Sequence, residues 1–351
     1  MKIPWAKPTI FGDEIDYISE AIKSTFISDG EFLWKCEEKL GFIHHGKCLC
    51  VANGTVSLQL ALQTLGISTG DEVLVPGWCF AAAPNMVLAC NATPVYVDVT
   101  EDTWLMNPNE IEKHITKRTK AIIPVHTYGN VCDMSLIRKI ANKHGLFVIE
   151  DCAESIFSKV DNKLCGEYSD IASYSFQATK TLTCGEGGMV LINNNWIDKA
   201  ILIRSHGLDR SSRNYYWHHL LGYNYRLTNI QAAMLFTQLQ HIDVIVNKRQ
   251  NIYDRYKKNL GSRHQLQLIN GNVDPVMWTL GLRIKNRDQV MDKLRSEGIE
   301  TRSGFCSFSD QPLYNTKPLL ISSVISKEIL CLPFFFDMTD EQIDFISERI
   351  S

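Results

Sequence analysis

The chain has 351 residues, 45% of them apolar and 21% charged, an ordinary composition for a globular protein with room for two packed units. Its formal net charge of −3 disfavours nucleic acid and anionic membrane surfaces as partners, because binding to either depends on concentrated positive charge. We therefore expect one larger and one smaller domain, and neither of these partners.

Short runs rich in valine and isoleucine alternate with helical patterns between residues 50 and 205. Cys48 and Cys50 lie on a further candidate strand, which precedes Gly54. Asp133 and Gly145 are residue types that cap the N-terminus and the C-terminus of a helix. Such alternation predicts an α/β fold with a mainly parallel sheet covered on both faces. The strand-like runs are 71–76, 94–99, 120–125, 146–151, 171–176 and 188–193.

The C-terminal third has its own elements. Apolar periodicity from Asn229 predicts a long helical stretch, after which glycine, asparagine and aspartate cluster at 261–274. We expect a large domain over residues 12–245 and a smaller C-terminal α/β domain over residues 246–351, which residues 1–11 join. The elements expected after the cluster are a strand at 278–284 and helices at 287–298 and 339–350.

The eleven cysteines are odd in number and contain no C-x-x-C pair, so the sequence predicts neither a disulfide framework nor a zinc ribbon. We expect them to be small buried side chains in a reducing compartment, and we expect no metal site. The first residues, MKIPWAKPTIFGDE, lack the apolar core of a signal peptide, and no later run approaches the roughly 18 apolar residues of a membrane span. These features predict a cytoplasmic protein.

Polar residues that follow strands are the first candidates for a site, because ligands bind beyond the carboxyl ends of the strands in open α/β sheets. Gly54 and Thr55 begin a predicted helix whose N-terminus could hold an anion or could simply be capped. Asp151 ends a very apolar strand, as a paired carboxylate or as a surface turn residue. Lys180 follows Ser175 and precedes three glycines, as a functional amine or as a solvated lysine.

Together these three places supply an anion cradle, a carboxylate and an amine at successive strand ends. Pyridoxal 5'-phosphate (PLP) needs this set: a lysine for its aldehyde, an acidic group beside its pyridine nitrogen and a helix N-terminus for its phosphate. A stacking aromatic ring would complete the site. Phe80 is placed for that role directly after the strand at 71–76, and Trp78 is the alternative.

The segments VANGTVSLQLAL, VIEDCAES, SYSFQATKTLTCGEGGMV and GYNYRLTNIQAAMLFTQL are similar to segments of the DegT/DnrJ/EryC1/StrS family of sugar-nucleotide aminotransferases. The resemblance covers nearly the whole chain and is strongest to the GDP-perosamine synthases. It implies a PLP-dependent aspartate aminotransferase fold (fold type I), with a seven-stranded sheet in the large domain. It also implies a homodimer with shared active sites.

The resemblance implies an aminotransferase that moves an amino group from L-glutamate to C4 of a nucleotide-linked 4-keto-6-deoxyhexose. The product would be a perosamine- or viosamine-type sugar. A sugar 3-aminotransferase is one alternative, and a PLP-fold binding or regulatory protein without turnover is another. Lys180 favours transamination, because related dehydratases of the same fold have histidine at that position.

Site residues are assigned by the same resemblance. Lys180 corresponds to the catalytic lysine that holds the cofactor covalently, and Asp151 to the partner of the pyridine nitrogen. The other cofactor contacts that it implies are Gly54, Thr55, Ser175 and Asn224 at the phosphate, with Asn224 from the neighbouring subunit, then Phe80 as the stacking ring and Glu154 near the cofactor.

The C-terminal segment departs from the pattern of perosamine synthases. After GIETR that pattern continues with a proline and later a histidine near the sugar, where this chain has Ser303 and Ser309. Arg302 and Tyr314 are retained, and we expect them at the substrate. The departure leaves the nucleotide and the sugar open.

Overall fold

The computed structural model describes residues 2–193, 196–209, 213, 216–314 and 316–350. A seven-stranded sheet has the order β1-β9-β8-β5-β4-β2-β3, and β9 alone runs antiparallel to the other six strands. The mainly parallel seven-stranded sheet is therefore confirmed. Its strands are β1 Lys47–Val51, β2 Glu72–Pro76, β3 Thr93–Val97, β4 Thr119–Ile122, β5 Phe147–Asp151, β8 Ile171–Ser175 and β9 Gly188–Ile192.

Both faces of this sheet are buried. Val73 and Val75 of β2 belong to one apolar cluster, whereas Leu74 between them belongs to a second cluster. This division arises because successive side chains of a strand point to opposite faces of the sheet. Since neither face is left to solvent, the strands are almost continuously apolar, as the sequence predicted.

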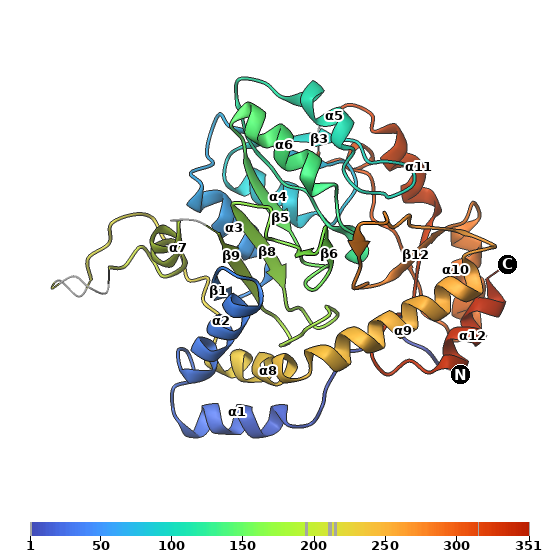
Figure 1. The fold of residues 1–351 in the computed structure, drawn as a ribbon, viewed down its shortest axis with the longest axis horizontal. Helices are drawn as coiled ribbons and strands as arrows, with labels where there is room; N and C mark the ends of the chain where they lie inside the picture. Colours follow the sequence, from blue (N-terminus) through green and yellow to red (C-terminus); the bar gives the residue numbers. More distant parts are fainter. Residues whose placement is uncertain (1, 194–195, 210–212, 214–215, 315, 351) are drawn as a thin grey trace.

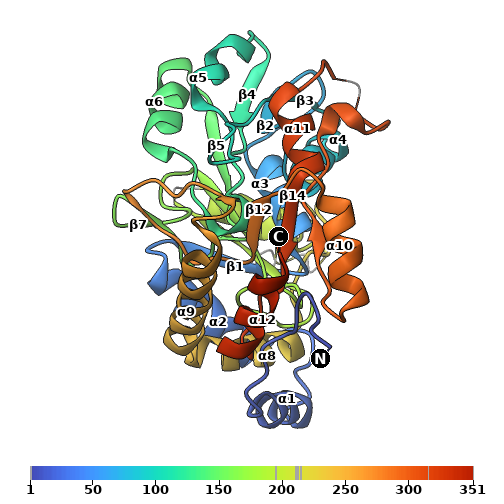
Figure 2. The same ribbon diagram turned by 90° about the vertical axis from the view of Figure 1, so that its right-hand side faces the viewer.

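Helices cover the two faces (Figure 1). α3 packs against β8 and β9, while α1 and α2 pack against α8 below the sheet. The view turned by 90° shows α9 beside the C-terminal helix α12 (Asp340–Arg349) (Figure 2). The helices of this part are α1 Glu14–Lys23, α2 Glu31–Ile43, α3 Gly54–Thr64, α4 Ala82–Ala89, α5 Pro108–Ile111, α6 Met134–His144, α7 Ile197–Arg204, α8 Asn229–Gln240 and α9 Ile242–Leu260.

Local signals account for several helix ends. Asp133 caps α6, with its Oδ1 accepting a hydrogen bond from the Leu136 N–H at 2.9 Å, and Gly145 ends the helix with a φ of 65° that favours glycine. The long helical stretch expected from Asn229 is instead two helices, which meet at His241.

A second sheet has the order β10-β12-β14-β13. The first residues attach to this part of the chain: Ile3 bridges Ile299, and the Trp5 carbonyl accepts a hydrogen bond from Phe334 N–H at 3.0 Å. The elements here are β10 Gln265–Leu266, β12 Leu280–Arg283, β13 Arg302–Ser303, β14 Ile329–Leu332, α10 Arg287–Ser296, α11 Leu320–Glu328 and α12 Asp340–Arg349.

A small third sheet crosses the expected domain boundary. In it β11 (Val273–Asp274) pairs with β6 (Lys159–Val160), which also pairs with β7 (Lys163–Leu164). In the sequence, the strands of the seven-stranded sheet all come before residue 245, and the strands of the four-stranded sheet all come after residue 246. The domain limits themselves stay a prediction.

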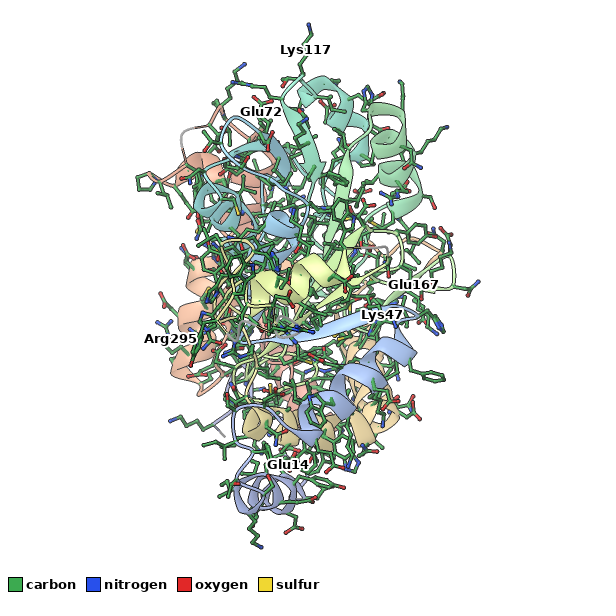
Figure 3. The ribbon with its side chains drawn as sticks, turned by 90° about the vertical axis from the view of Figure 1, so that its left-hand side faces the viewer. Glu14, Lys47, Glu72, Lys117, Glu167 and Arg295 are labelled. Atoms are coloured by element: carbon green, nitrogen blue, oxygen red, sulfur yellow. The ribbon has the colours of Figure 1, made fainter. Side chains whose placement is uncertain are left out.

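The surface and the interior follow the composition. Charged side chains of both signs, such as Lys117, Glu167 and Arg295, extend outward from the ribbon (Figure 3). Ten of the eleven cysteines are buried and all are free thiols, as expected for small apolar side chains. Within the part of the chain that the structure describes, no helix is long and apolar enough to cross a membrane.

Candidate active site

The N-terminus of α3 lies at the end of β8. Asn53 caps this helix, because its Oδ1 accepts a hydrogen bond from the Val56 N–H at 3.0 Å. Gly54 and Thr55 follow and line a cavity. The first N–H groups of a helix have no partner within it, so this helix end can bind an anion.

Glycines let the helix end approach the strands closely. A Cβ on Gly54 would lie 2.7 Å from the Cβ of Ser175, and a Cβ on Gly188 would lie 2.6 Å from the carbonyl carbon of Asn53. Side chains larger than hydrogen would push the ends of β8 and β9 away from α3. Ser175 thereby joins Gly54 in the lining of the cavity.

Lys180 closes a tight turn after β8, where its N–H donates to the Gln177 carbonyl at 2.8 Å. The side chain of Gln177 fixes the turn, since its Oε1 accepts hydrogen bonds from the N–H and the hydroxyl of Thr179 at 2.9 and 2.7 Å. The Lys180 side chain is only 14% exposed. It is therefore not a solvated surface lysine.

Two groups contact the Lys180 amine. Its Nζ donates to Oε1 of Glu154 at 3.3 Å, and the other oxygen of Glu154 accepts a hydrogen bond from the Tyr128 N–H at 2.8 Å. On another side, Nζ lies 3.9 Å from the centroid of the Trp278 ring. A carboxylate and an aromatic face thus hold the amine beside the cavity.

Asp151 is the last residue of β5 and is 6% exposed. Burial raises its pKa to about 6, although a hydrogen bond from the Ala153 N–H and the charges of Lys180 and His126 act in the opposite direction. A buried carboxylate of this kind gains most from a cationic partner. Protonated pyridine nitrogen is such a partner, so a buried carboxylate here fits PLP.

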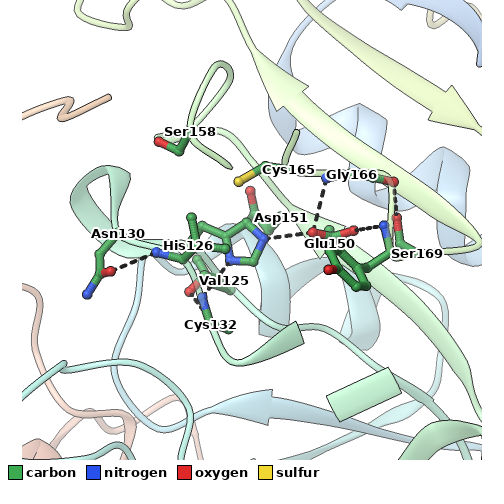
Figure 4. Close-up of polar contacts among 12 residues, drawn as sticks. Val125, His126, Asn130, Cys132, Glu150, Asp151, Ser158, Cys165, Gly166 and Ser169 are labelled. Atoms are coloured by element: carbon green, nitrogen blue, oxygen red, sulfur yellow. Dashed lines mark hydrogen bonds and ion pairs between the residues drawn. The ribbon is translucent and has the colours of Figure 1, made fainter. Parts of the chain in front are cut away.

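Glu150, next to Asp151, points into a buried network on the other side of β5 (Figure 4). Its carboxylate accepts hydrogen bonds from His126 Nε2 at 2.9 Å and from two backbone N–H groups at 3.0 and 3.1 Å. The ligand atoms of His126, Glu150 and Cys152 lie within 4.8 Å of one another, a spacing that a metal ion could use. Because hydrogen bonds already engage the carboxylate and both nitrogens of the imidazole, the network fixes the end of β5.

One cavity of about 810 Å³ brings most of the predicted residues together, a size typical of ligand sites. Phe80 lines it and is 59% exposed, with its ring edge-on to Phe305 at a centroid distance of 6.1 Å. Trp78 is fully buried and does not line it, which favours Phe80 as the stacking ring. The predicted residues in the lining are Gly54, Thr55, Phe80, Asp151, Glu154, Ser175 and Lys180.

Three predicted residues lie outside this lining. Asn224 is exposed. Arg302 is exposed, with its guanidinium 5.7 Å from the ring centroid of Trp5, which does line the cavity. Tyr314 is 6% exposed and its hydroxyl donates to Asn85 Oδ1 at 2.7 Å.

Ser309, at the position for which the resemblance implies a histidine, is hydrogen-bonded to other parts of the C-terminal region. Its hydroxyl lies 3.0 Å from that of Ser307 and 3.2 Å from that of Ser323, and it accepts a hydrogen bond from the Leu319 N–H at 3.2 Å. Ser309 does not line the cavity.

The cavity also has walls that the sequence did not predict: Trp5 near the N-terminus, Trp278 before β12 and Phe305 after β13. No local pattern marks these aromatic residues, because each reaches the site from a distant part of the chain. Asn53 was missed as well, although its place directly before Gly54 is an N-cap signal.

Comparisons with known proteins show which family the chain resembles in sequence and in fold. The DegT/DnrJ/EryC1/StrS aminotransferase family model matches residues 8–351. GDP-perosamine synthase of Escherichia coli O157:H7 is 38% identical over 357 residues, covering 99% of this chain and 98% of that protein. The PMP form of the putative sugar aminotransferase Spr1654 from Streptococcus pneumoniae has a TM-score of 0.94 at 25% identity, covering 99% of this chain and 96% of that one. DesV of S. venezuelae has a TM-score of 0.92 at 30% identity, with coverage of 96% and 93%.

The fold and these similarities define a PLP-dependent enzyme with the aspartate aminotransferase fold, which confirms the expected fold class and cofactor. The donor set fits PLP, because an anion-binding helix end, a buried carboxylate and a partly buried amine line one cavity. The chain belongs to the DegT/DnrJ/EryC1/StrS aminotransferase family and is a sugar aminotransferase.

Proposed function

We propose that this enzyme transfers the amino group of L-glutamate to C4 of a nucleotide-linked 4-keto-6-deoxyhexose, giving a perosamine- or viosamine-type sugar. The observation that carries the proposal is the single cavity in which Lys180, Asp151 and the N-terminus of α3 meet. The 38% identity to a GDP-perosamine synthase over 99% of the chain supports C4 as the position of the new amine.

Each residue has a role in this proposal. PLP, when bound, supplies an electron sink for the carbanion formed at the substrate. Lys180 would hold the cofactor covalently and, as a free amine, would carry the proton that leaves the substrate carbon. Asp151 stabilises the protonated pyridine nitrogen. The remaining cofactor contacts are Gly54, Thr55 and Ser175 at the phosphate, Phe80 on the ring and Glu154 at the Lys180 amine.

The second subunit completes the phosphate site in this proposal. Asn224 is exposed and outside the cavity of its own chain. Asn224 forms a β-bridge with Ser205 at the base of the segment between α7 and α8, and the described part of that segment projects away from the sheet at the left of Figure 1. These features support a homodimer in which Asn224 reaches the phosphate in the partner's cavity.

Arg302 and Tyr314 stay predicted substrate residues, and Arg302 is the better placed of the two. Its guanidinium lies over Trp5 at the wall of the cavity, where a cation could bind the diphosphate of a nucleotide sugar. Tyr314 packs against Phe308 with a centroid distance of 4.7 Å and does not line the cavity.

A substrate panel tests the proposal. PLP-loaded enzyme and L-glutamate are incubated with GDP-, UDP- and dTDP-linked 4-keto-6-deoxyhexoses and with the corresponding 3-keto sugars, and the products are identified by mass and by NMR. We expect an amine at C4 from at least one 4-keto sugar. Amine formation from 3-keto sugars alone would establish the 3-aminotransferase instead, and no amine from any sugar would contradict the proposal.

A further inference from the structure

The aromatic face beneath Lys180 has no role in the chemistry described above. We propose that Trp278 is a further catalytic residue. Its indole face holds the Lys180 amine by a cation–π interaction whenever that amine is not bonded to the cofactor. The inference rests on the proposed role of Lys180, because only an amine that leaves the cofactor and returns to it needs such a contact.

The contact between Lys180 and Trp278 is close and partly shielded from water. Nζ lies 3.9 Å from the ring centroid, whereas the other lysines that lie over aromatic rings in the described residues are 4.8 to 5.8 Å away. Trp278 is 9% exposed and Lys180 is 14% exposed in its side chain. A cation over an indole face is attracted more strongly when both are withdrawn from solvent.

Contacts that do not involve the Lys180 amine hold the indole of Trp278 in place. Its Nε1 donates to the Thr179 carbonyl at 2.8 Å, one residue from Lys180, and its backbone N–H donates to the Tyr128 carbonyl at 2.9 Å. Trp5 packs edge-on against it with a centroid distance of 5.6 Å. The ring therefore presents a preset face to the amine.

The buried Arg249 of α9 also holds the backbone at Trp278 in place. It is 3% exposed, and its Nη1 donates to the carbonyls of Met277 and Trp278, each at 3.2 Å. Among the described residues no carboxylate forms an ion pair with it, so these carbonyls and the ring of Phe334 are what stabilise the buried charge. A buried cation is unfavourable unless it is hydrogen-bonded, and here it fastens the segment that carries Trp278.

A ring face suits an amine that must leave and return. Lysine is a flexible chain, and a freed amine would spread over many rotamers unless it were held. Glu154 offers the amine one hydrogen bond, at 3.3 Å. Trp278 attracts the amine without a directional hydrogen bond. The amine is therefore kept near the substrate proton, but it can still reorient toward that proton.

The contact itself can be tested by NMR without any turnover. Lysines of the cofactor-free full-length protein are reductively methylated with a ¹³C label, and the Lys180 signal is assigned by its absence from Lys180→Ala. We expect an upfield ring-current shift of this signal in the wild type and in Trp278→Phe, and an ordinary position in Trp278→Leu. Trp196→Leu is the matched control, because it removes a ring 5.8 Å from another lysine, Lys199, and should leave the Lys180 signal unchanged.

The role is tested in the holoenzyme. After glutamate has converted the cofactor to its amino form, 2-oxoglutarate is added, and the return of the cofactor to Lys180 is followed by absorbance. Trp278→Leu should slow this return by about 3- to 30-fold, which is the range expected for loss of a cation–π contact, while Trp278→Phe should stay near the wild-type rate.

The outcomes separate the two proposals. An unshifted Lys180 signal in the wild type, or equal return rates in Trp278→Leu and Trp278→Phe, would overturn the role of Trp278 alone. No 2-oxoglutarate from glutamate in the wild type would overturn the proposed function, whatever the position of the Lys180 signal.

Discussion

The buried position of Asp151 opposes ionisation of its carboxyl group. Asp151 is buried at the end of β5, and burial raises its pKa from an ordinary 3.8 to about 6. The folded chain therefore binds this proton more tightly than the unfolded chain does. The contribution of this protonated carboxyl group to the free energy of unfolding is fully present below pH ~4 and is lost as the pH rises through 6.

We expect Asp151→Asn to stabilise the cofactor-free protein at pH 8 by about 1–3 kcal/mol, because the amide avoids a buried charge. Urea unfolding at several pH values measures this, and the difference should shrink as the pH approaches 5. The same substitution should lower the rate of transamination by about 10²- to 10³-fold or more, since the amide cannot stabilise the pyridinium. A variant that transaminates at nearly the wild-type rate would make Asp151 a structural residue only.

Lys180→Ala should abolish covalent attachment of the cofactor while leaving a folded protein, because the lysine side chain lines a cavity and its loss enlarges a ligand site. Borohydride reduction of PLP-loaded protein, followed by peptide mass analysis, should place the cofactor on the Lys180 peptide of the wild type and on no peptide of the variant. Cofactor on a different lysine of the wild type would refute the assignment.

At the scale of elements, the sequence predicted what local signals control. The Val- and Ile-rich strands, the caps of α6 by Asp133 and Gly145, and the candidate site residues at or soon after the ends of β5 and β8 follow from periodicity and position. Trp5 and Trp278 could not be found this way, because their positions in the site depend on how remote segments pack. The break at His241 was also missed, since the apolar pattern continues across it.

The junction of α3 and β8 gives a prediction at this scale. Gly54→Ala should destabilise the protein by about 1–3 kcal/mol and weaken PLP binding at least tenfold, because the new methyl group would collide with Ser175 and shift the anion site. Gly271→Ala is the matched control, since a Cβ there meets no atom within 4 Å. Titration with PLP and thermal unfolding measure both effects, and equal behaviour of the two variants would refute the close-packing argument.

At the scale of the whole molecule, the active site of one subunit is proposed to need Asn224 of the other. We expect Lys180→Ala and Asn224→Asp to be inactive alone, the second because a carboxylate repels the cofactor phosphate. In a mixed dimer both lesions fall in one site and the other site is intact, so subunit exchange should restore up to half of the wild-type activity per mixed dimer. No recovery despite exchange demonstrated by native mass analysis would show that Asn224 serves its own chain.

The fate of the glutamate nitrogen shows whether the enzyme is a sugar 4-aminotransferase. The PLP-loaded enzyme is given ¹⁵N-labelled L-glutamate and the nucleotide 4-keto-6-deoxyhexose on which it is most active, and the product is analysed by mass and by NMR. We predict one ¹⁵N on C4 of the sugar, one 2-oxoglutarate for each amino sugar, and neither product with Lys180→Ala. An unlabelled amine, an amine at another carbon, or labelled product from Lys180→Ala would contradict the account.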